Sequence, residues 1–156
     1  MVETDALPHR HLMTVALNVD FQNMVAIGRT PTGHRTIAPV TGGTFEGERL
    51  SGTVLGGEDW AITRATGNVA IDVRVTLQTE DAINIYLTYQ GAFRAVPEVM
   101  QRFAAGEVLD PSDYVLAITA RFECGARQLS WLNEIVAAGT GRQTPAGPVY
   151  SIYEIG

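Results

Sequence analysis

The sequence has very little cysteine and no long apolar run, and each shortage excludes a class of protein. Cys124 is the only cysteine among 156 residues, which excludes an intrachain disulfide and a cage of several cysteine ligands. We therefore expect a reducing, cytoplasmic setting. No stretch approaches the roughly 20 apolar residues of a membrane helix. Residues 1–11 lack the basic start and apolar stretch of a signal peptide, so we expect none.

Positive charge is also scarce. Eleven Lys and Arg stand against seventeen Asp and Glu, which gives a formal net charge of -6. Nucleic-acid binding depends on basic surfaces that neutralise phosphates, so we expect no nucleic-acid partner. The same acidic balance argues against attachment to anionic lipid, and we expect no membrane partner.

The motifs of common cofactors and nucleophiles are missing as well. The chain has no phosphate-binding loop, no strand that leads into a Gly-x-Gly-x-x-Gly helix, and no serine in a Gly-x-Ser-x-Gly context. His9 and His11 form a His-x-His pair, but the sequence places no third ligand beside them. We therefore expect neither a cofactor nor a metal.

Short apolar segments punctuated by glycine dominate what is present, with 46% hydrophobic residues and 16 glycines. Segments rich in Val, Ile, Thr and aromatic residues recur about every ten residues, as in an all-β sandwich or barrel. The sequence therefore predicts one mainly β domain over residues 1–156, an antiparallel barrel of about ten strands. The expected strands are residues 11–19, 23–28, 34–41, 49–55, 60–65, 69–78, 83–90, 114–123, 129–138 and 148–155. Turns are expected at Gly42-Gly43, Gly56-Gly57, Gly67-Asn68 and 79–82, and a loop at Gly139-x-Gly141.

One short helix is predicted within residues 91–113. Pro97 can open it, Met100 and Phe103 fall close to helical spacing, and Gly106 can end it. This excursion either forms a lid over the barrel mouth or plugs the open end of the barrel.

Polar and apolar residues alternate along several expected strands. In 70–78, Ile71 begins one face of apolar residues, whereas Asp72 and Arg74 share the other. The same pattern groups Arg121 with Glu123 in 115–123, and Trp131 with Asn133 in 131–137. Either the charged faces meet water, or they converge with the aromatic rings on a ligand cavity.

Asp59 stands directly after the glycine pair and before Trp60. An aspartate at a turn often serves only to cap that turn. The functional alternative is a carboxylate at the barrel mouth. Partial desolvation beside an aromatic ring would raise its pKa and suit it to general acid or base work near neutrality.

Several blocks of the sequence resemble the domain-of-unknown-function family 3237, from about Gly28 to the C-terminus. They are residues 42–47, 50–54, 57–60 and 72–81, Ile85-Tyr86 with Gly91, residues 121–123, and Trp131-Leu132-Asn133. The resemblance implies a small antiparallel barrel, similar to calycins or allene-oxide-cyclase barrels, with a cavity and homo-oligomeric, most simply dimeric, assembly. Ala82 stands where the family tends to have glycine, and Cys124-Gly125 replaces a commoner threonine. These departures suggest a different turn and an altered pocket rim.

Three hypotheses about function follow. The first is a cofactor-independent isomerase, cyclase or lyase that acts by acid–base chemistry on a small apolar or aromatic metabolite. Its candidate catalytic residues are Asp59 or Glu123 for proton transfer and Arg74 or Arg121 for oxyanion stabilisation. Its candidate substrate-binding residues are Trp60, Asp72, Tyr86, Trp131 and Asn133. The second hypothesis is a barrel that binds a small ligand without changing it. The third is a structural domain whose charged pairs are only surface ion pairs.

Overall fold

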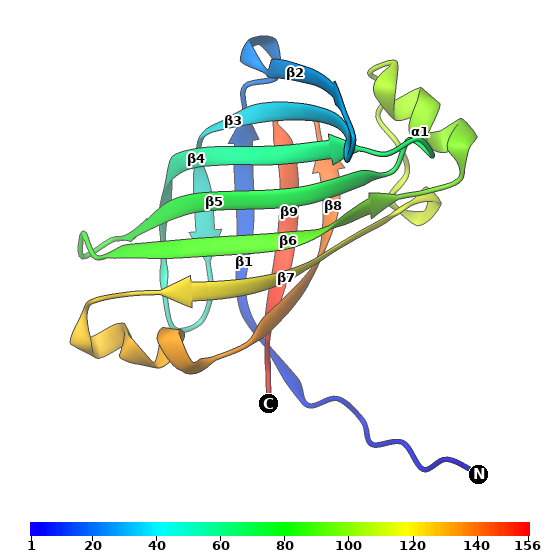
Figure 1. Cartoon of the computed structure of the whole chain (residues 1–156). Coiled ribbons are helices and arrows are strands. Elements are labelled where there is room, and N and C mark those ends of the chain that lie inside the picture. Colours follow the sequence, from blue (N-terminus) through cyan, green and yellow to red (C-terminus); the bar gives the residue numbers. More distant parts are fainter.

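Nine antiparallel strands make up most of the computed structural model, which describes residues 1–156 (Figure 1). The strands are β1 (His9–Val19), β2 (Val25–Thr30), β3 (Gly33–Glu46), β4 (Ser51–Thr63), β5 (Val69–Thr79), β6 (Asn84–Arg94), β7 (Val115–Glu123), β8 (Ala137–Thr144) and β9 (Gly147–Ile155). The helices are α1 (Pro97–Ala104) and three 3-10 segments, η1 (Phe21–Asn23), η2 (Pro111–Asp113) and η3 (Arg127–Glu134). No helix has the length and apolar character needed to cross a membrane.

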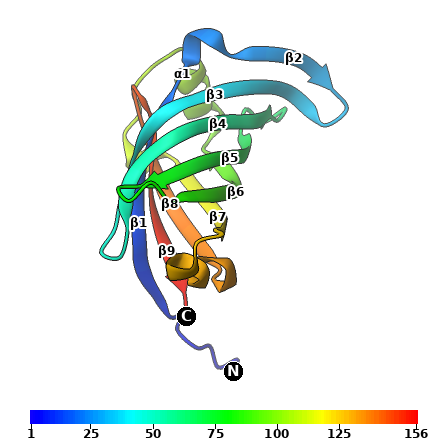
Figure 2. The same ribbon diagram turned by 90° about the vertical axis from the view of Figure 1, so that its left-hand side faces the viewer.

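Pairing between the first and third strands closes the sheet into a barrel. The order β1-β9-β8-β7-β6-β5-β4-β3 returns to β1, where residues 14–19 pair with the second half of β3. The remaining strand, β2, pairs with the first half of β3, and Figure 2 shows this hairpin extending past the barrel wall. The predicted antiparallel β-barrel is confirmed, with nine strands in place of about ten.

The largest correction to the expected strands concerns Gly56-Gly57. The expected strands 49–55 and 60–65 are one continuous strand, β4, and the glycine pair lies inside it rather than at a turn. A β-bulge between Val54 and Gly56 absorbs one extra residue there. A Cβ at Gly57 would collide with the backbone oxygen of Arg74, so close strand contact, not a chain reversal, requires this glycine.

Two other glycine pairs also lie within strands. Gly42-Gly43 sits in β3 where it pairs with β1, and Gly139 and Gly141 sit in β8. The expected strand at 129–138 is wrong, because residues 127–134 form η3 and β8 begins only at Ala137. Leu132 in η3 is completely buried, so the apolar residues of this segment cover a barrel end instead of joining the sheet.

Side chains fill the half of the barrel next to η3. The fully buried residues there come from six elements: Leu12, Met13, Phe45, Leu77, Ile85, Leu87, Leu132 and Ile152. Helix α1 begins at Pro97 as predicted and lies at the opposite end of the barrel from η3 (Figure 1). The packed half supplies the core, and the half beside α1 is left to form a cavity.

Candidate functional site

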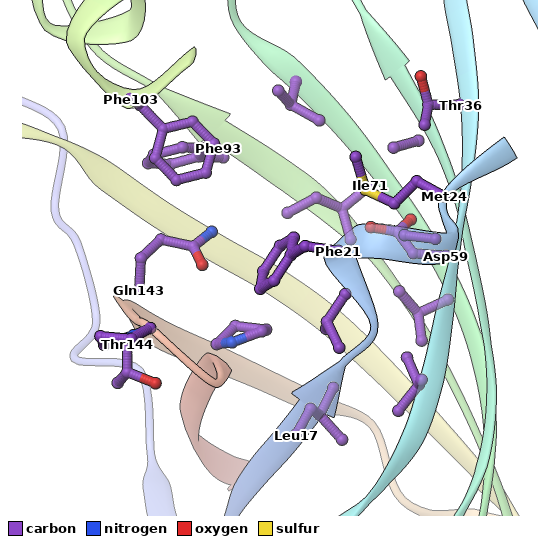
Figure 3. Close-up of a pocket in the computed structure, with 18 of the residues that line it drawn as sticks. Leu17, Phe21, Met24, Thr36, Asp59, Ile71, Phe93, Phe103, Gln143 and Thr144 are labelled. Carbon is purple, nitrogen blue, oxygen red and sulfur yellow. The ribbon is translucent and has the colours of Figure 1, made fainter. Parts of the chain in front are cut away.

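A cavity of about 520 Å³ occupies the barrel interior on the α1 side, and 17 of its 26 lining residues are hydrophobic (Figure 3). This volume lies within the range of small-molecule sites. Its mouth is formed by η1 with Phe21, by Phe103 of α1 and the loop after it, and by the end of β8 with Gln143 and Thr144. No Lys, Arg or His lines it. Nowhere in the structure do three His, Cys, Asp or Glu side chains cluster as metal ligands do.

Asp59 places a carboxyl group deep inside this cavity. It lies on β4 opposite Val73 of β5, and Figure 3 shows its carboxylate among the lining side chains. The backbone N–H of Asp72 donates to its Oδ1 at 3.1 Å. Burial raises the pKa of Asp59 from 3.8 to about 6, because desolvation outweighs the Asp72 hydrogen bond and the Arg35 charge, which both lower it. The carboxyl can therefore both release and take up a proton near neutral pH.

The bulge in β4 decides which side chains point inward. Side chains alternate along a strand, so uninterrupted alternation from the buried Val54 would turn Glu58 and Trp60 into the barrel. The extra residue at the bulge inverts the order, and Asp59 and Ala61 line the cavity instead. Glu58 is correspondingly exposed on the outside.

Two tyrosines lie at the same depth as Asp59. Tyr89 of β6 and Tyr150 of β9 line the cavity and pack edge to face, with ring centroids 5.0 Å apart. Burial raises the pKa of both phenols, so both stay protonated at neutral pH. Gly141 on β8 leaves room for this arrangement, since a Cβ there would come within 2.6 Å of the Tyr150 ring.

The candidate residues on β5 and β7 face away from the cavity. Asp72, Arg74 and Arg121 line a second, polar depression on the outside of the barrel. Their strands alternate without a bulge, so the buried apolar face points inward and the charged face outward. Trp60 joins them, with the Arg74 guanidinium 5.0 Å from its ring centroid.

Four further candidates also lie outside the cavity. Tyr86 and Glu123 are opposite each other on the exposed faces of β6 and β7. Trp131 in η3 packs under the guanidinium of Arg49, 4.0 Å from the ring centroid. The Asn133 amide accepts the backbone N–H of Cys124 at 2.8 Å and donates to its carbonyl at 2.9 Å, which fastens η3 to the end of β7. Of the nine candidate residues, Asp59 alone lines the cavity.

Tyr89 and Tyr150 were not identified from the sequence. Within the expected strand 83–90, Tyr89 shares its face with Ile85 and Leu87, and all three are buried. A tyrosine on an otherwise aliphatic buried face is a signal, because its hydroxyl requires a polar partner or a cavity. The partner, Tyr150, is 61 positions along the chain, and no local pattern joins the two.

Together these features define a small closed β-barrel with an internal, largely apolar cavity that carries one carboxyl group, Asp59, at its floor and a second, Glu107, in the loop after α1. The chain belongs to the family described as "Protein of unknown function (DUF3237)", which it matches over residues 8–155. It is 26% identical over 153 residues to a UPF0311 protein of Rhodopseudomonas palustris, covering 97% of this chain and 99% of that one.

Two further relatives bear on fold and function. The crystal structure of a β-barrel-like protein from Acinetobacter baumannii matches with a TM-score of 0.84 and 31% identity, over the full length of both chains. The "Hydroalkoxylation enzyme phnH" of Penicillium herquei is 27% identical over 106 residues, which cover 68% of this chain and 56% of that enzyme. The barrel fold is therefore shared with the Acinetobacter protein, and one distant relative is a named enzyme.

Proposed function

We propose that this protein is an enzyme that transfers protons on a small, largely apolar or aromatic metabolite inside the barrel, in an isomerisation, cyclisation or related lyase step. The observation that carries the proposal is the Asp59 carboxyl, which lies in a mostly apolar cavity with its pKa raised to about 6. A carboxyl that titrates near neutrality can act as both acid and base in one turnover. Its chemistry invokes no bound cofactor.

Within this class, ring closure by addition of a hydroxyl group to a carbon–carbon double bond fits the site well. In that reaction the hydroxyl oxygen bonds to one alkene carbon, and its proton ends on the other carbon, so no atom is lost. Asp59 would take the proton from the hydroxyl group and return it to carbon. The name of the Penicillium herquei relative, a hydroalkoxylation enzyme, supports this choice of reaction.

Eight of the sequence candidates have no part in this proposal because they lie outside the cavity: Trp60, Asp72, Arg74, Tyr86, Arg121, Glu123, Trp131 and Asn133. A second candidate function, binding a ligand without reaction, is favoured by the largely apolar lining. It predicts that a bound compound is recovered unchanged after long incubation.

The test is turnover of a panel of alkenyl phenols and enones by the wild type, Asp59→Asn and the matched control Glu58→Gln. Glu58 neighbours Asp59 on β4 but faces outward. We expect the wild type to form a product of unchanged mass, Asp59→Asn to lower kcat by about 10²–10⁴-fold, and Glu58→Gln to leave it unchanged. Equal turnover by Asp59→Asn would remove Asp59 from the mechanism. Tight binding without any conversion would favour the second candidate function, binding of a ligand without reaction.

A further inference from the structure

The strand register brings Asp59 and the two tyrosines to one level, the floor of the cavity. Asp59 pairs with Val73, and Val73 pairs with Tyr89 on the next strand. Neighbouring strands are about 4.8 Å apart, so the backbones of Asp59 and Tyr89 are about 10 Å apart along the curved wall, and their side chains converge inward. Tyr150 reaches the same floor from β9 and contacts the Tyr89 ring.

The tyrosine pair offers a hydrogen-bond donor to a ligand. Each phenol carries one O–H group, and both side chains line the cavity with their rings 5.0 Å apart. Burial keeps both phenols protonated, so a hydroxyl of the pair can donate to an oxygen bound in the cavity. The Thr144 hydroxyl, by contrast, donates to the backbone oxygen of Gly147 at 2.6 Å, and Gln143 lines the cavity beside Thr144 (Figure 3).

The charge of the lining restricts what can bind. The cavity lining has two carboxyl groups, Asp59 at the floor and Glu107 in the loop after α1, and no Lys, Arg or His. Arg102 forms an ion pair with Glu107 but does not itself line the cavity. An anionic ligand would lose its hydration without gaining a counter-charge, which is costly in an apolar site. An uncharged ligand avoids this cost.

We infer that the Tyr89–Tyr150 pair donates the hydrogen bond that holds a substrate oxygen at the floor, and that the substrate is uncharged, with a phenolic hydroxyl or ketone oxygen near its reacting carbon. This inference rests on the proposed function of the cavity. The bound donor would stabilise negative charge that develops on this oxygen while Asp59 moves the proton. The pair thereby takes the role that the sequence suggested for Arg74 or Arg121, which lie outside the barrel.

Three probes that share a naphthalene ring test the inference: 2-naphthol, naphthalene and naphthalene-2-sulfonate, with binding followed by fluorescence or calorimetry. They are compared in the wild type, the Tyr89→Phe and Tyr150→Phe variants and the double variant. The control is Tyr153→Phe, because the Tyr153 ring packs against His9 and His11 away from the cavity. Naphthalene reports whether the cavity keeps its shape after each substitution.

We expect the wild type and Tyr153→Phe to bind 2-naphthol equally well, and the double variant to bind it about tenfold more weakly, the loss typical of one hydrogen bond. Naphthalene should bind all variants alike, and the sulfonate should bind at least tenfold more weakly than 2-naphthol. The inference is overturned if the double variant retains full affinity for 2-naphthol, if the sulfonate binds as tightly, or if the wild type does not bind 2-naphthol.

The outcome is distinguishable from that of the turnover experiment. Turnover that depends on Asp59 but not on either tyrosine hydroxyl would keep the proposed function and overturn the tyrosine role. If 2-naphthol binding depends on the tyrosine hydroxyls but no compound is converted, the tyrosine role is supported and the proposed enzymatic function is refuted.

Discussion

The Asp59→Asn substitution should stabilise the folded protein, and the gain should depend on pH. The carboxyl is buried in the cavity and its folded-state pKa is raised from 3.8 to about 6. A raised pKa means that the folded state holds this proton more tightly than the unfolded state. The stability contributed by the protonated carboxyl is therefore fully present below pH 3.8, and it is lost as the pH rises through about 6.

The size of this change in unfolding free energy follows from the two pKa values of Asp59, in the unfolded and the folded state. At about 1.4 kcal/mol for each tenfold change in proton affinity, the interval from 3.8 to about 6 costs the folded wild type about 3 kcal/mol once the pH exceeds both values. Roughly half of this cost is already present at pH 5, so about 1.4 kcal/mol is added between pH 5 and pH 8. Asparagine has the same shape, carries no charge and avoids this cost.

The assay is urea unfolding of the wild type, Asp59→Asn and Glu58→Gln at several values between pH 5 and pH 8. We expect the free energy of unfolding of Asp59→Asn to exceed that of the wild type, by a margin that grows across this range. Glu58→Gln should show no such growth, since Glu58 is exposed. A margin that stays constant with pH, or that shrinks as the pH rises, would refute the reasoning that desolvation governs this carboxyl.

Two other substitutions test how the barrel is held together. Asn133→Ala should lower the free energy of unfolding by about 2 kcal/mol, because the backbone N–H and C=O of Cys124 both lose their partner. Ser130→Ala is the control in the same denaturant titration, because Ser130 contacts Asn133 only through its backbone oxygen. Ala82→Gly should raise stability by about 0.5–1 kcal/mol, because Ala82 has a φ of 62°, where glycine is not strained. Thermal unfolding measures this gain, and an unchanged or lower Tm would contradict the strain argument.

The local sequence pattern was sufficient to predict which side chains of a strand point inward, provided that polar and apolar residues alternate without interruption. In β5 and β7 the buried positions are apolar and the charged side chains face outward, as one of the two sequence interpretations held. Helix α1 begins at Pro97, a residue whose fixed backbone angle suits the first helical position. The 3-10 segment η3 was not predictable in the same way. Its alternation is that of a strand, but Asn133 and the buried Leu132 hold it across the end of the barrel.

The sequence by itself determined that this chain forms antiparallel strands with one apolar face, because alternation with a period of two is a local property. Only the tertiary structure decided that Asp59 faces the cavity while Trp60 faces outward. A shift of one residue inverts every later side chain in a strand. That shift occurs at the bulge between Val54 and Gly56, which is set by pairing with β5 rather than by neighbouring residues in the chain. Closure of β1 on β3 likewise joins distant segments, and it is this closure that brings Tyr150 to Tyr89.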